Sequence, residues 1–372
     1  MNSDKTLHDP VQLGELKLQN RFVVAPLTRQ RADKDSFIPN DVMKEYYTQR
    51  ASFGLIITEC SQVSKLSDVF YWSGGIYSKE QALGWKKIVD SVHEKGGLIM
   101  LQIWHCGRSA NISQLGGNKP VAPSPIAINY KSRATGEDYP VPHELTIEEI
   151  KEVVQQFKQG AIYAKEAGFD GIELHGANGY LVDQFLRDGS NKRTDIYGGS
   201  AENRSRFCLE VIDALAEVFG YGRTALRLSP TGRFNDMYDS DPIGLLSYLL
   251  PELDKRNLAF VEFKRHGALE NRAVVYPDRK TPQEQMPDFF RIIKKLYKGN
   301  FIANDNLSIE EAQELVQEEV AQACSFGYKS INNPDLPLRV KNGWKLNENL
   351  DRDTLFTQGP KGYTDYPFYN QE

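Results

Sequence analysis

Short apolar runs recur along the chain and alternate with segments of helical periodicity. The runs are nearly continuous, as expected of parallel strands that are buried on both faces of a sheet. Eight of them are present, at Arg21–Thr28, Gly54–Cys60, Gly97–His105, Phe169–His175, Thr224–Ser229, Leu258–Lys264, Asn300–Asn304 and Val320–Phe326. The pattern therefore predicts eight buried strands.

The seven segments between these runs carry apolar residues on one helix face. Between residues 85 and 92, for example, apolar residues recur at positions i, i+3, i+4 and i+7. Thr146 with Glu149, and Ser308 with Glu311, have the spacing of a capping box at a helix start. The sequence thus predicts a helix between each strand and the next.

Eight strands separated by seven helical segments favour a (β/α)8 barrel that forms one domain over residues 1–372. An open, doubly wound sheet shows the same alternation, and counting strands does not exclude it. The first strand–helix turn lacks a GxGxxG pattern, which weakens that alternative. Two irregular stretches, 106–145 and 266–282, are expected to be loops over the barrel mouth.

The composition adds limits on the class of protein. Of 372 residues, 40% are hydrophobic and 26% are charged, as in ordinary globular proteins. The net charge of -5 and the lack of a Lys/Arg cluster argue against a nucleic-acid partner. No apolar run is long enough for a membrane span, residues 1–10 lack a signal core, and the four cysteines form no CxxC pair. We therefore expect a cytoplasmic protein without a structural metal.

In such a barrel, catalytic groups collect at the carboxyl ends of the strands. The polar residues expected there are Thr28, Gln102, His105, His175, Asn178, Arg227, Lys264, Arg265, Asn304, Asp305, Tyr328 and Lys329. They contain no set that suits a metal, and the chain has no GxSxG nucleophile turn at a strand end. A ring of hydrogen-bond donors suits a large, flat cofactor with polar edges better than it suits hydrolysis.

The most distinctive local motif is His175-Gly-Ala-Asn178-Gly-Tyr180, directly after a predicted strand. His175 and Asn178 can both donate to one carbonyl oxygen and stabilise negative charge that develops on it. Tyr180 is protonated at neutral pH and can supply a proton. A histidine satisfied at a strand end, followed by ordinary turn residues, is an equally simple interpretation of this spacing.

Several ordered motifs carry a resemblance to a known family. They are Asn20–Arg31, Tyr46–Glu59, Gln102–Arg108, Glu166–Tyr180, Asp183–Arg206, Arg227–Pro242, Asn333–Pro337 and Gly362–Phe368. Over nearly the whole chain they resemble the old yellow enzymes, which are FMN-dependent ene-reductases built on a (β/α)8 barrel. The resemblance implies FMN as cofactor and NADPH or NADH as electron donor.

The resemblance also implies roles around the flavin. Thr28 matches the residue that hydrogen-bonds the flavin O4, and Pro26 and Cys60 match positions at the flavin edge. Gln102 matches a side chain at the pyrimidine edge, and Arg227 matches a cation near N1 and O2. A fixed positive charge there stabilises the reduced flavin. Strand-end capping or ion pairing is the alternative for Thr28, Gln102 and Arg227.

On the substrate side, His175 and Asn178 match the pair that holds the carbonyl of an α,β-unsaturated compound. Tyr180 matches the proton donor, and Tyr363 matches an aromatic residue that lines the substrate site. The implied reaction transfers hydride from flavin N5 to the β-carbon of an enone or enal, and Tyr180 protonates the α-carbon.

The sequence departs from the family where the flavin phosphate is expected. Asn304 and Asp305 follow the seventh strand, and Asp305 stands where a glycine is usual. Asp tolerates a left-handed backbone, but a carboxylate about 4 Å from the phosphate costs on the order of several kcal/mol at an effective dielectric of 20.

The stretch after the eighth strand also differs, because Tyr328 follows Gly327 where the family has a phosphate-binding arginine. Losing that contact removes about 1.5–3 kcal/mol. Residues 262–266 replace a usual pattern of His and Glu-Pro-Arg. Either backbone amides with Lys329, Lys264 or Arg265 still hold the phosphate, or the phosphate site is lost.

Two functions other than ene-reduction also fit the sequence. One is an inactive barrel that serves as a binding or scaffold protein, and another is a flavin reductase that acts on nitro compounds or peroxides. The charge balance argues against nucleic acid or a membrane as partner, and the family resemblance implies a monomer or a homodimer.

Overall fold

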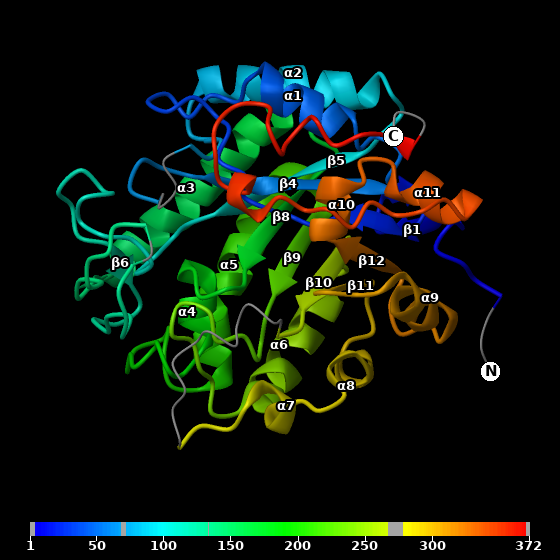
Figure 1. Ribbon diagram of the computed structural model, residues 1–372. Coiled ribbons are helices and arrows are strands. Elements are labelled where there is room, and N and C mark those ends of the chain that lie inside the picture. Colours follow the sequence, from blue (N-terminus) through cyan, green and yellow to red (C-terminus); the bar gives the residue numbers. More distant parts are fainter. Residues whose placement is uncertain (1–3, 68–71, 133, 267–277, 370–372) are drawn as a thin grey trace.

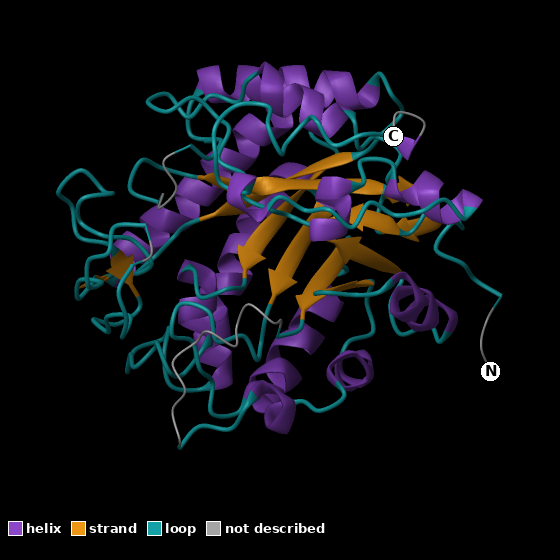
Figure 2. Ribbon diagram, viewed as in Figure 1, coloured by secondary structure: helices purple, strands orange, loops and turns teal. Residues whose placement is uncertain are grey.

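Eight parallel strands close into a barrel in the computed structural model, which describes residues 4–67, 72–132, 134–266 and 278–369 (Figures 1 and 2). The strands are β3 (Phe22–Val24), β4 (Leu55–Gln62), β5 (Ile99–Trp104), β8 (Gly171–Gly176), β9 (Thr224–Leu228), β10 (Phe260–Lys264), β11 (Phe301–Asn304) and β12 (Ala323–Phe326). All eight predicted strands are confirmed. Cys324 of β12 pairs with Phe22 of β3, which closes the barrel and rules out the open sheet.

The first strand is shorter than its apolar run predicts. The ladder ends at Val24, although the amide of Ala25 still donates to the Phe326 carbonyl at 3.1 Å. Pro26 follows and has no N–H to continue the ladder. The chain therefore leaves the barrel wall at Pro26, and Thr28 comes to lie at the mouth.

The seven predicted helices are also present and surround the barrel (Figure 2). They are α1 (Asp41–Thr48), α2 (Lys79–His93), α3 (Ile147–Glu166), α5 (Ala201–Phe219), α6 (Pro242–Arg256), α8 (Phe289–Leu296) and α9 (Ile309–Gln317). The described part of the chain has four additional short α-helices: α4 (Leu181–Leu186), α7 (Pro282–Gln285), α10 (Tyr328–Asn332) and α11 (Leu336–Asn342). Their periodic patterns are too short to detect in the sequence.

Only one of the two predicted capping boxes forms completely. At the start of α3, the Thr146 and Glu149 side chains each accept a hydrogen bond from the other residue's backbone N–H. At the start of α9, the Ser308 hydroxyl accepts from the Glu311 amide at 3.0 Å. The Glu311 carboxylate binds both terminal nitrogens of Arg265 instead, at 2.6 and 2.9 Å. The stronger charge-assisted pair takes this carboxylate away from the cap.

A hairpin that the sequence analysis missed closes the amino-terminal end of the barrel. Strands β1 (Val11–Leu13) and β2 (Leu16–Leu18) pair antiparallel, and their leucines pack with the first residues of the barrel strands. Gly14 makes the turn with φ +57°, and a Cβ atom there would lie 2.4 Å from the Gly222 carbonyl oxygen. The signal was a period-2 pattern around a two-residue turn that contains glycine.

The opposite end of the barrel is covered by irregular chain. In its described residues, the predicted loop 106–145 contains two short strands, β6 (Val121–Ala122) and β7 (His143–Glu144). Most of the second predicted loop, 267–277, lies outside the described residues. The C-terminal segment, red in Figure 1, reaches α1, where the Gln49 side chain donates to the Thr364 carbonyl at 2.8 Å.

None of the helices in the described part of the chain combines the length and apolar character of a membrane span.

The complete capping box of α3 gives a stability prediction. Thr146→Ala removes the side-chain acceptor and should lower the free energy of unfolding by about 1 kcal/mol. Thr146→Ser keeps an acceptor oxygen and should recover most of that loss. Urea denaturation followed by circular dichroism measures both; an alanine variant as stable as the wild type would contradict the assignment.

Candidate active site

A cavity of about 210 Å³ opens at the carboxyl ends of the strands. Its lining residues are Pro26, Leu27, Thr28, Arg29, Cys60, Gln102, His175, Asn178, Tyr180, Tyr328, Ile331, Leu355 and Phe356. Eight of the thirteen are residues that the sequence analysis assigned to the site. Strand ends far apart in the sequence thus meet at one small chamber.

The turn after β8 supplies three of these side chains. The Nδ1 atom of His175 accepts from the Ala177 amide at 3.3 Å, so the neutral ring carries its proton on Nε2. Burial, together with Arg227 and Lys264, lowers the pKa of His175 well below its ordinary value. The imidazole is therefore a neutral donor at physiological pH.

Asn178 is fixed by its own backbone. It adopts the left-handed conformation with φ +56°, which Asn tolerates better than most residues. Its amide N–H donates to the Ser229 hydroxyl at 2.8 Å, and its carbonyl accepts from the Asn235 side chain at 2.9 Å. These two bonds satisfy the backbone N–H and C=O groups of Asn178, and neither of them uses its side-chain amide.

Aromatic edges hold the ring of Tyr180. Its centroid lies 4.5 Å from Trp104 and 5.0 Å from His175, and both contacts are nearly perpendicular. Burial raises the pKa of Tyr180 well above its ordinary value, and nearby Cys60 and Tyr139 act in the same direction. The phenol therefore keeps its proton at physiological pH.

Strands β3, β4 and β5 form the opposite wall. The Thr28 hydroxyl and the Cys60 thiol lie 3.1 Å apart. The pairing between β4 and β5 shifts register between Ile57 and Cys60, so that Cys60 stands opposite Gln102. Such a bulge re-aims side chains beside a site. The Gln102 side chain donates to Glu173 at 2.8 Å.

Arg227 lies in the barrel interior next to the cavity and is not among its lining residues. One terminal nitrogen is paired with Glu262, and the other donates to the Asn304 side-chain oxygen at 2.7 Å. Its Nε atom is buried without a hydrogen-bond partner in the described chain, as is the Oε2 atom of Glu173. Such orphaned atoms are rare in native structures.

Of the residues predicted for the phosphate end, Tyr328 lines the cavity, whereas Asn304, Asp305 and Gly327 lie beyond its lining. Asp305 has φ +102°, a backbone conformation that glycine would adopt more easily. Its carboxylate is 3.4 Å from the Lys264 ammonium group, and both side chains are 17% exposed. Arg265 also contacts this turn, because its Nε atom donates to the Asp305 carbonyl at 3.2 Å, but its two terminal nitrogens are held by Glu311.

Gly327 and Tyr328 follow β12. A Cβ atom on Gly327 would meet only Leu27, at 3.7 Å, so there is room beside this backbone. The Tyr328 side chain lines the cavity, and the guanidinium of Arg352 lies 5.4 Å from its ring centre. Lys329 is half-buried. The pKa of Glu310 is lowered mainly by hydrogen bonds from its own backbone and from Ser308, and Lys329 adds a smaller effect in the same direction.

The expectation for Tyr363 has to be corrected. Its side chain is fully buried and stacks on Tyr46 at 4.1 Å, away from the cavity lining. Arg29 and Arg31 lie over the same ring. The aromatic residue that lines the cavity from the C-terminal segment is Phe356, which is 56% exposed. Nothing in the local sequence around Leu355 and Phe356 marked them as site residues.

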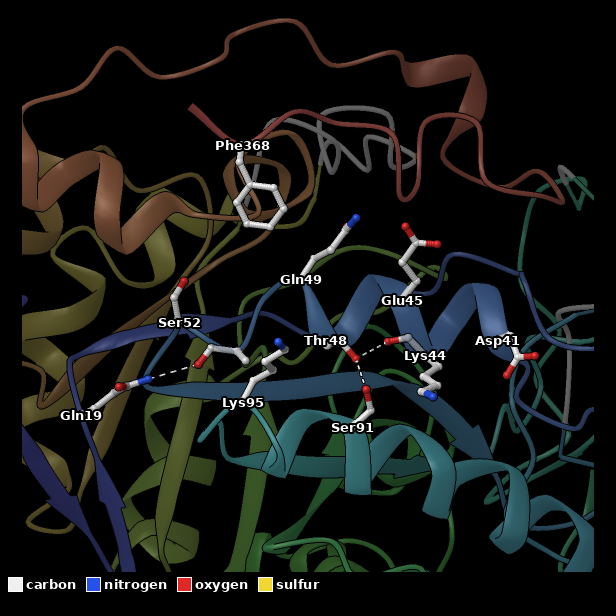
Figure 3. Close-up of a pocket in the computed structure, with 11 residues that line it drawn as sticks. Gln19, Asp41, Lys44, Glu45, Thr48, Gln49, Ser52, Ser91, Lys95 and Phe368 are labelled. Atoms are coloured by element: carbon white, nitrogen blue, oxygen red, sulfur yellow. Dashed lines mark hydrogen bonds between the residues drawn. The ribbon is translucent and has the colours of Figure 1, made fainter. Parts of the chain in front are cut away.

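A second, larger hollow of about 790 Å³ lies outside the barrel, between α1, α2 and the C-terminal segment (Figure 3). Figure 3 shows the Thr48 hydroxyl between the Lys44 carbonyl, at 2.7 Å, and the Ser91 hydroxyl, at 2.6 Å. None of the predicted site residues lines this hollow. Within the described residues there is also no group of acidic, histidine or cysteine side chains that could hold a metal.

Fold and cavity together define a barrel enzyme that binds small molecules above its strand ends. The model of the NADH:flavin oxidoreductase / NADH oxidase family matches residues 6–347. A probable flavin mononucleotide-dependent alkene reductase of Leishmania infantum is 43% identical over 96% of both chains. The 12-oxophytodienoate reductase 1 of Oryza sativa is 40% identical over 97% of this chain and 93% of its own.

Solved structures agree with these matches. The old yellow enzyme homologue of Zymomonas mobilis is 37% identical, covers 98% of this chain and all of its own, and has a TM-score of 0.90. Morphinone reductase in complex with tetrahydroNAD is 40% identical over 98% of both chains, with a TM-score of 0.88. The chain belongs to the old yellow enzyme family of FMN-dependent oxidoreductases.

The two ends of the site fit FMN unequally. At the ring end, the orphaned Nε of Arg227 is a buried donor, and Thr28, Cys60 and Gln102 stand around the same cavity. This donor set fits a flat ring system with polar edges. At the phosphate end, the open space beside Gly327 fits, whereas the Asp305 carboxylate fits only because Lys264 neutralises it.

A buried neutral histidine at the mouth predicts acid sensitivity. His105 accepts from the Gly107 amide at 3.0 Å, and burial lowers its pKa to about 3. In the unfolded chain the pKa is near 6.5, so the unfolded state binds the extra proton first as pH falls. When the pH falls from 7.5 to 5, the free energy of unfolding should drop by about 2 kcal/mol because of His105. His175 should add a further loss in the same direction.

Denaturant unfolding at both pH values checks this prediction. His105→Gln keeps an acceptor for the Gly107 amide but cannot take up a proton. The variant should therefore lose less stability on acidification than the wild type does. An equal loss in both proteins would show that His105 is not buried as a neutral ring.

Proposed function

We propose that this protein is an FMN-dependent NAD(P)H ene-reductase that reduces the activated C=C bond of α,β-unsaturated carbonyl compounds. The observation that carries the proposal is the convergence of His175, Asn178 and Tyr180 on the cavity that Thr28 and Gln102 line from the opposite wall. The relatives named as an alkene reductase and as 12-oxophytodienoate reductases support the same reaction.

FMN, when bound, would accept hydride from NADPH or NADH and deliver it to the β-carbon of the substrate. Thr28, Cys60 and Gln102, with the backbone near Pro26, would hold the flavin ring, and Arg227 would face its N1 and O2 edge. Asn304, Asp305, Gly327 and Tyr328 would lie around the ribityl phosphate. These assignments follow the order of the family motifs along the chain.

The protein's own contribution begins with the substrate carbonyl. The neutral His175 ring offers its Nε2–H, and Asn178 offers its side-chain amide N–H groups. The His175 ring is held by the Ala177 amide, and the backbone of Asn178 is held by Ser229 and Asn235, before the substrate arrives. Preorganised donors of this kind stabilise an oxyanion without reorganisation during the reaction.

Tyr180 would then deliver a proton to the α-carbon. Its raised pKa keeps the phenol protonated, and the perpendicular contacts with Trp104 and His175 restrict the ring. Leu355 and Phe356 supply an apolar side of the same cavity.

At the phosphate end, we propose that Lys264 supplies the positive charge that the family obtains from an arginine. Support comes from its position 3.4 Å from Asp305 and from the engagement of Arg265 by Glu311. Lys264 can leave Asp305 for a phosphate because an ammonium group on a flexible stem pairs as a point charge.

We further propose a cytoplasmic, single-domain enzyme that acts as a monomer or homodimer on small molecules, without a nucleic-acid partner. All four cysteines are buried thiols, as a reducing compartment permits, and the net charge is -5. Reduction of nitro compounds or peroxides on the same flavin is the second enzymatic candidate, and a scaffold role is the third.

The first experiment records the visible spectrum of the purified protein and titrates FMN into it. A yellow protein that oxidises NADPH or NADH only when an enone is added supports the proposal. Preference for nitro compounds or peroxides over enones would replace it with the second candidate. A protein that stays colourless at tens of micromolar FMN would leave the scaffold role.

Replacing the proton donor should separate the two halves of the reaction. Tyr180→Phe removes the phenolic proton and should slow enone reduction by roughly 10²- to 10⁴-fold. Reduction of the bound FMN by NAD(P)H should change little, since that step needs no proton from Tyr180. Stopped-flow absorbance of the flavin measures both steps.

Tyr248→Phe serves as the matched control, because Tyr248 lies on α6, outside the cavity lining. It should change neither step substantially. Equal enone rates in the Tyr180→Phe variant and the wild type would remove Tyr180 from the proposed mechanism.

Removing the carboxylate at the phosphate end should tighten FMN binding. Asp305→Gly deletes a like charge and suits the φ of +102° at this position. We expect the Kd for FMN to fall at least about tenfold, which corresponds to 1.4 kcal/mol. The Kd for riboflavin, which has no phosphate, should stay within a factor of two. Quenching of flavin fluorescence measures both constants.

Lys264→Met tests the opposite sign and should weaken FMN binding without affecting riboflavin. If Asp305→Gly changes both flavins equally, the carboxylate acts on the fold of the turn and not on the phosphate.

A further inference from the structure

A buried ion pair stands beside the cavity in a place that the proposed mechanism does not explain. His175, Arg227 and Glu262 are direct neighbours across β8, β9 and β10. The Glu262 side chain is fully buried, and that of Arg227 is 6% exposed. Glu262 therefore lies one strand away from the residue expected at the N1 edge of the flavin.

Further hydrogen bonds fix this pair. One Glu262 oxygen binds Arg227, and the other accepts from the Ser325 hydroxyl. The Asn304 amide donates to the same Ser325 oxygen at 2.7 Å, while its side-chain oxygen accepts from Arg227. The four residues form a closed ring of contacts across β9, β10, β11 and β12. Arg227 can therefore hardly leave Glu262.

The second nearby carboxyl group does not add a charge. Burial and the neighbouring Glu262 raise the pKa of Glu173 well above its ordinary value. One Glu173 oxygen accepts from Gln102, and the other has no partner within the described residues. With Glu173 protonated, the charges that remain are those of the Arg227–Glu262 ion pair, and they sum to zero. The guanidinium charge is compensated inside the barrel wall before any cofactor binds.

We propose that Glu262 is a positioning residue that lowers the reduction potential of the bound flavin by compensating the charge of Arg227. The inference rests on the proposed function, because it takes Arg227 to face the N1 and O2 edge. It concerns a residue of this chain that departs from the family pattern, which has His and Glu-Pro-Arg in the stretch occupied here by residues 262–266.

The charge balance of flavin reduction gives the direction of the effect. Hydride from NAD(P)H carries two electrons and one proton, so the nicotinamide is oxidised and the reduced flavin ring gains one negative charge. An uncompensated cation at N1 stabilises that charge, and a cation already paired with a carboxylate does so less. The oxidised flavin is neutral at the ring and responds little. Pairing therefore favours the oxidised form, and reduced flavin becomes a stronger hydride donor to an alkene.

The test measures the midpoint potential of FMN bound to the wild type and to Glu262→Gln, by reductive titration against a reference dye. We expect the variant to have the higher potential, with the reduced form stabilised at least about tenfold, or about 30 mV for a two-electron couple. Glu262→Gln keeps the size of the side chain and an acceptor oxygen for Ser325, so that mainly the charge changes.

Glu173→Gln is the matched control, because it replaces a neutral acid with a neutral amide on β8, on the other side of the β9 strand that carries Arg227. Its potential at pH 7 should stay close to that of the wild type, well within the shift of Glu262→Gln. Equal shifts in both variants would show that any change in the polar interior moves the potential, and would overturn the proposal.

The remaining outcomes are also decisive. Glu262→Gln leaves Arg227 without its counter-charge and can fail to fold. In that case Glu262→His, which carries the type of residue found in the family pattern, tests the same loss of charge. An unchanged or lower potential in the folded variant overturns the role of Glu262 but not the proposed function. A wild type that binds no FMN overturns the proposed function itself.

Discussion

Closure of the barrel is the constraint on which every other feature of this protein depends. The pairing of Cys324 with Phe22 joins the last strand to the first and fixes the register of the strands between them. Because the strands are parallel, their carboxyl ends form one ring. Residues as distant as Thr28, Gln102, His175 and Tyr328 meet at one cavity for this reason alone.

Within that ring, the polar groups near the reacting atoms are kept neutral or paired. His175 and His105 are buried as neutral rings, Tyr180 retains its proton, and the charge of Arg227 is paired with that of Glu262. Burial produces the first three states because it penalises the charged form of each group. A site of this kind distinguishes substrates by hydrogen-bond geometry more than by net charge.

The barrel could be predicted from the sequence because its strands are buried on both faces and its helices on one. Both kinds of burial produce a characteristic spacing of hydrophobic residues. The strand ends and the residues after them could therefore be placed from the sequence. The hairpin at Gly14 was missed because each of its strands has only three residues. Glu311 shows a different limit, since a capping pattern cannot reveal that Arg265 competes for the same carboxylate.

Tyr363 lies away from the cavity and Phe356 lines it for the same physical reason. A motif identifies a segment, but only packing decides which of its side chains faces the ligand. Arg29 donates to the carbonyls of Leu355 and Gly362, and its neighbour Arg31 donates to that of Thr354. The position of Phe356 thus depends on arginines more than 300 residues earlier, which no local pattern can show.

This bond between the two ends of the chain also orders events during synthesis. Arg29 and Arg31 leave the ribosome early, and their guanidinium groups stay without the carbonyls that satisfy them until residues 354–362 have been translated. The barrel wall can assemble strand by strand before then, but the cavity lacks the side bounded by Leu355 and Phe356. The cavity of a nascent chain is therefore completed only after β12, the last strand of the barrel, has been made.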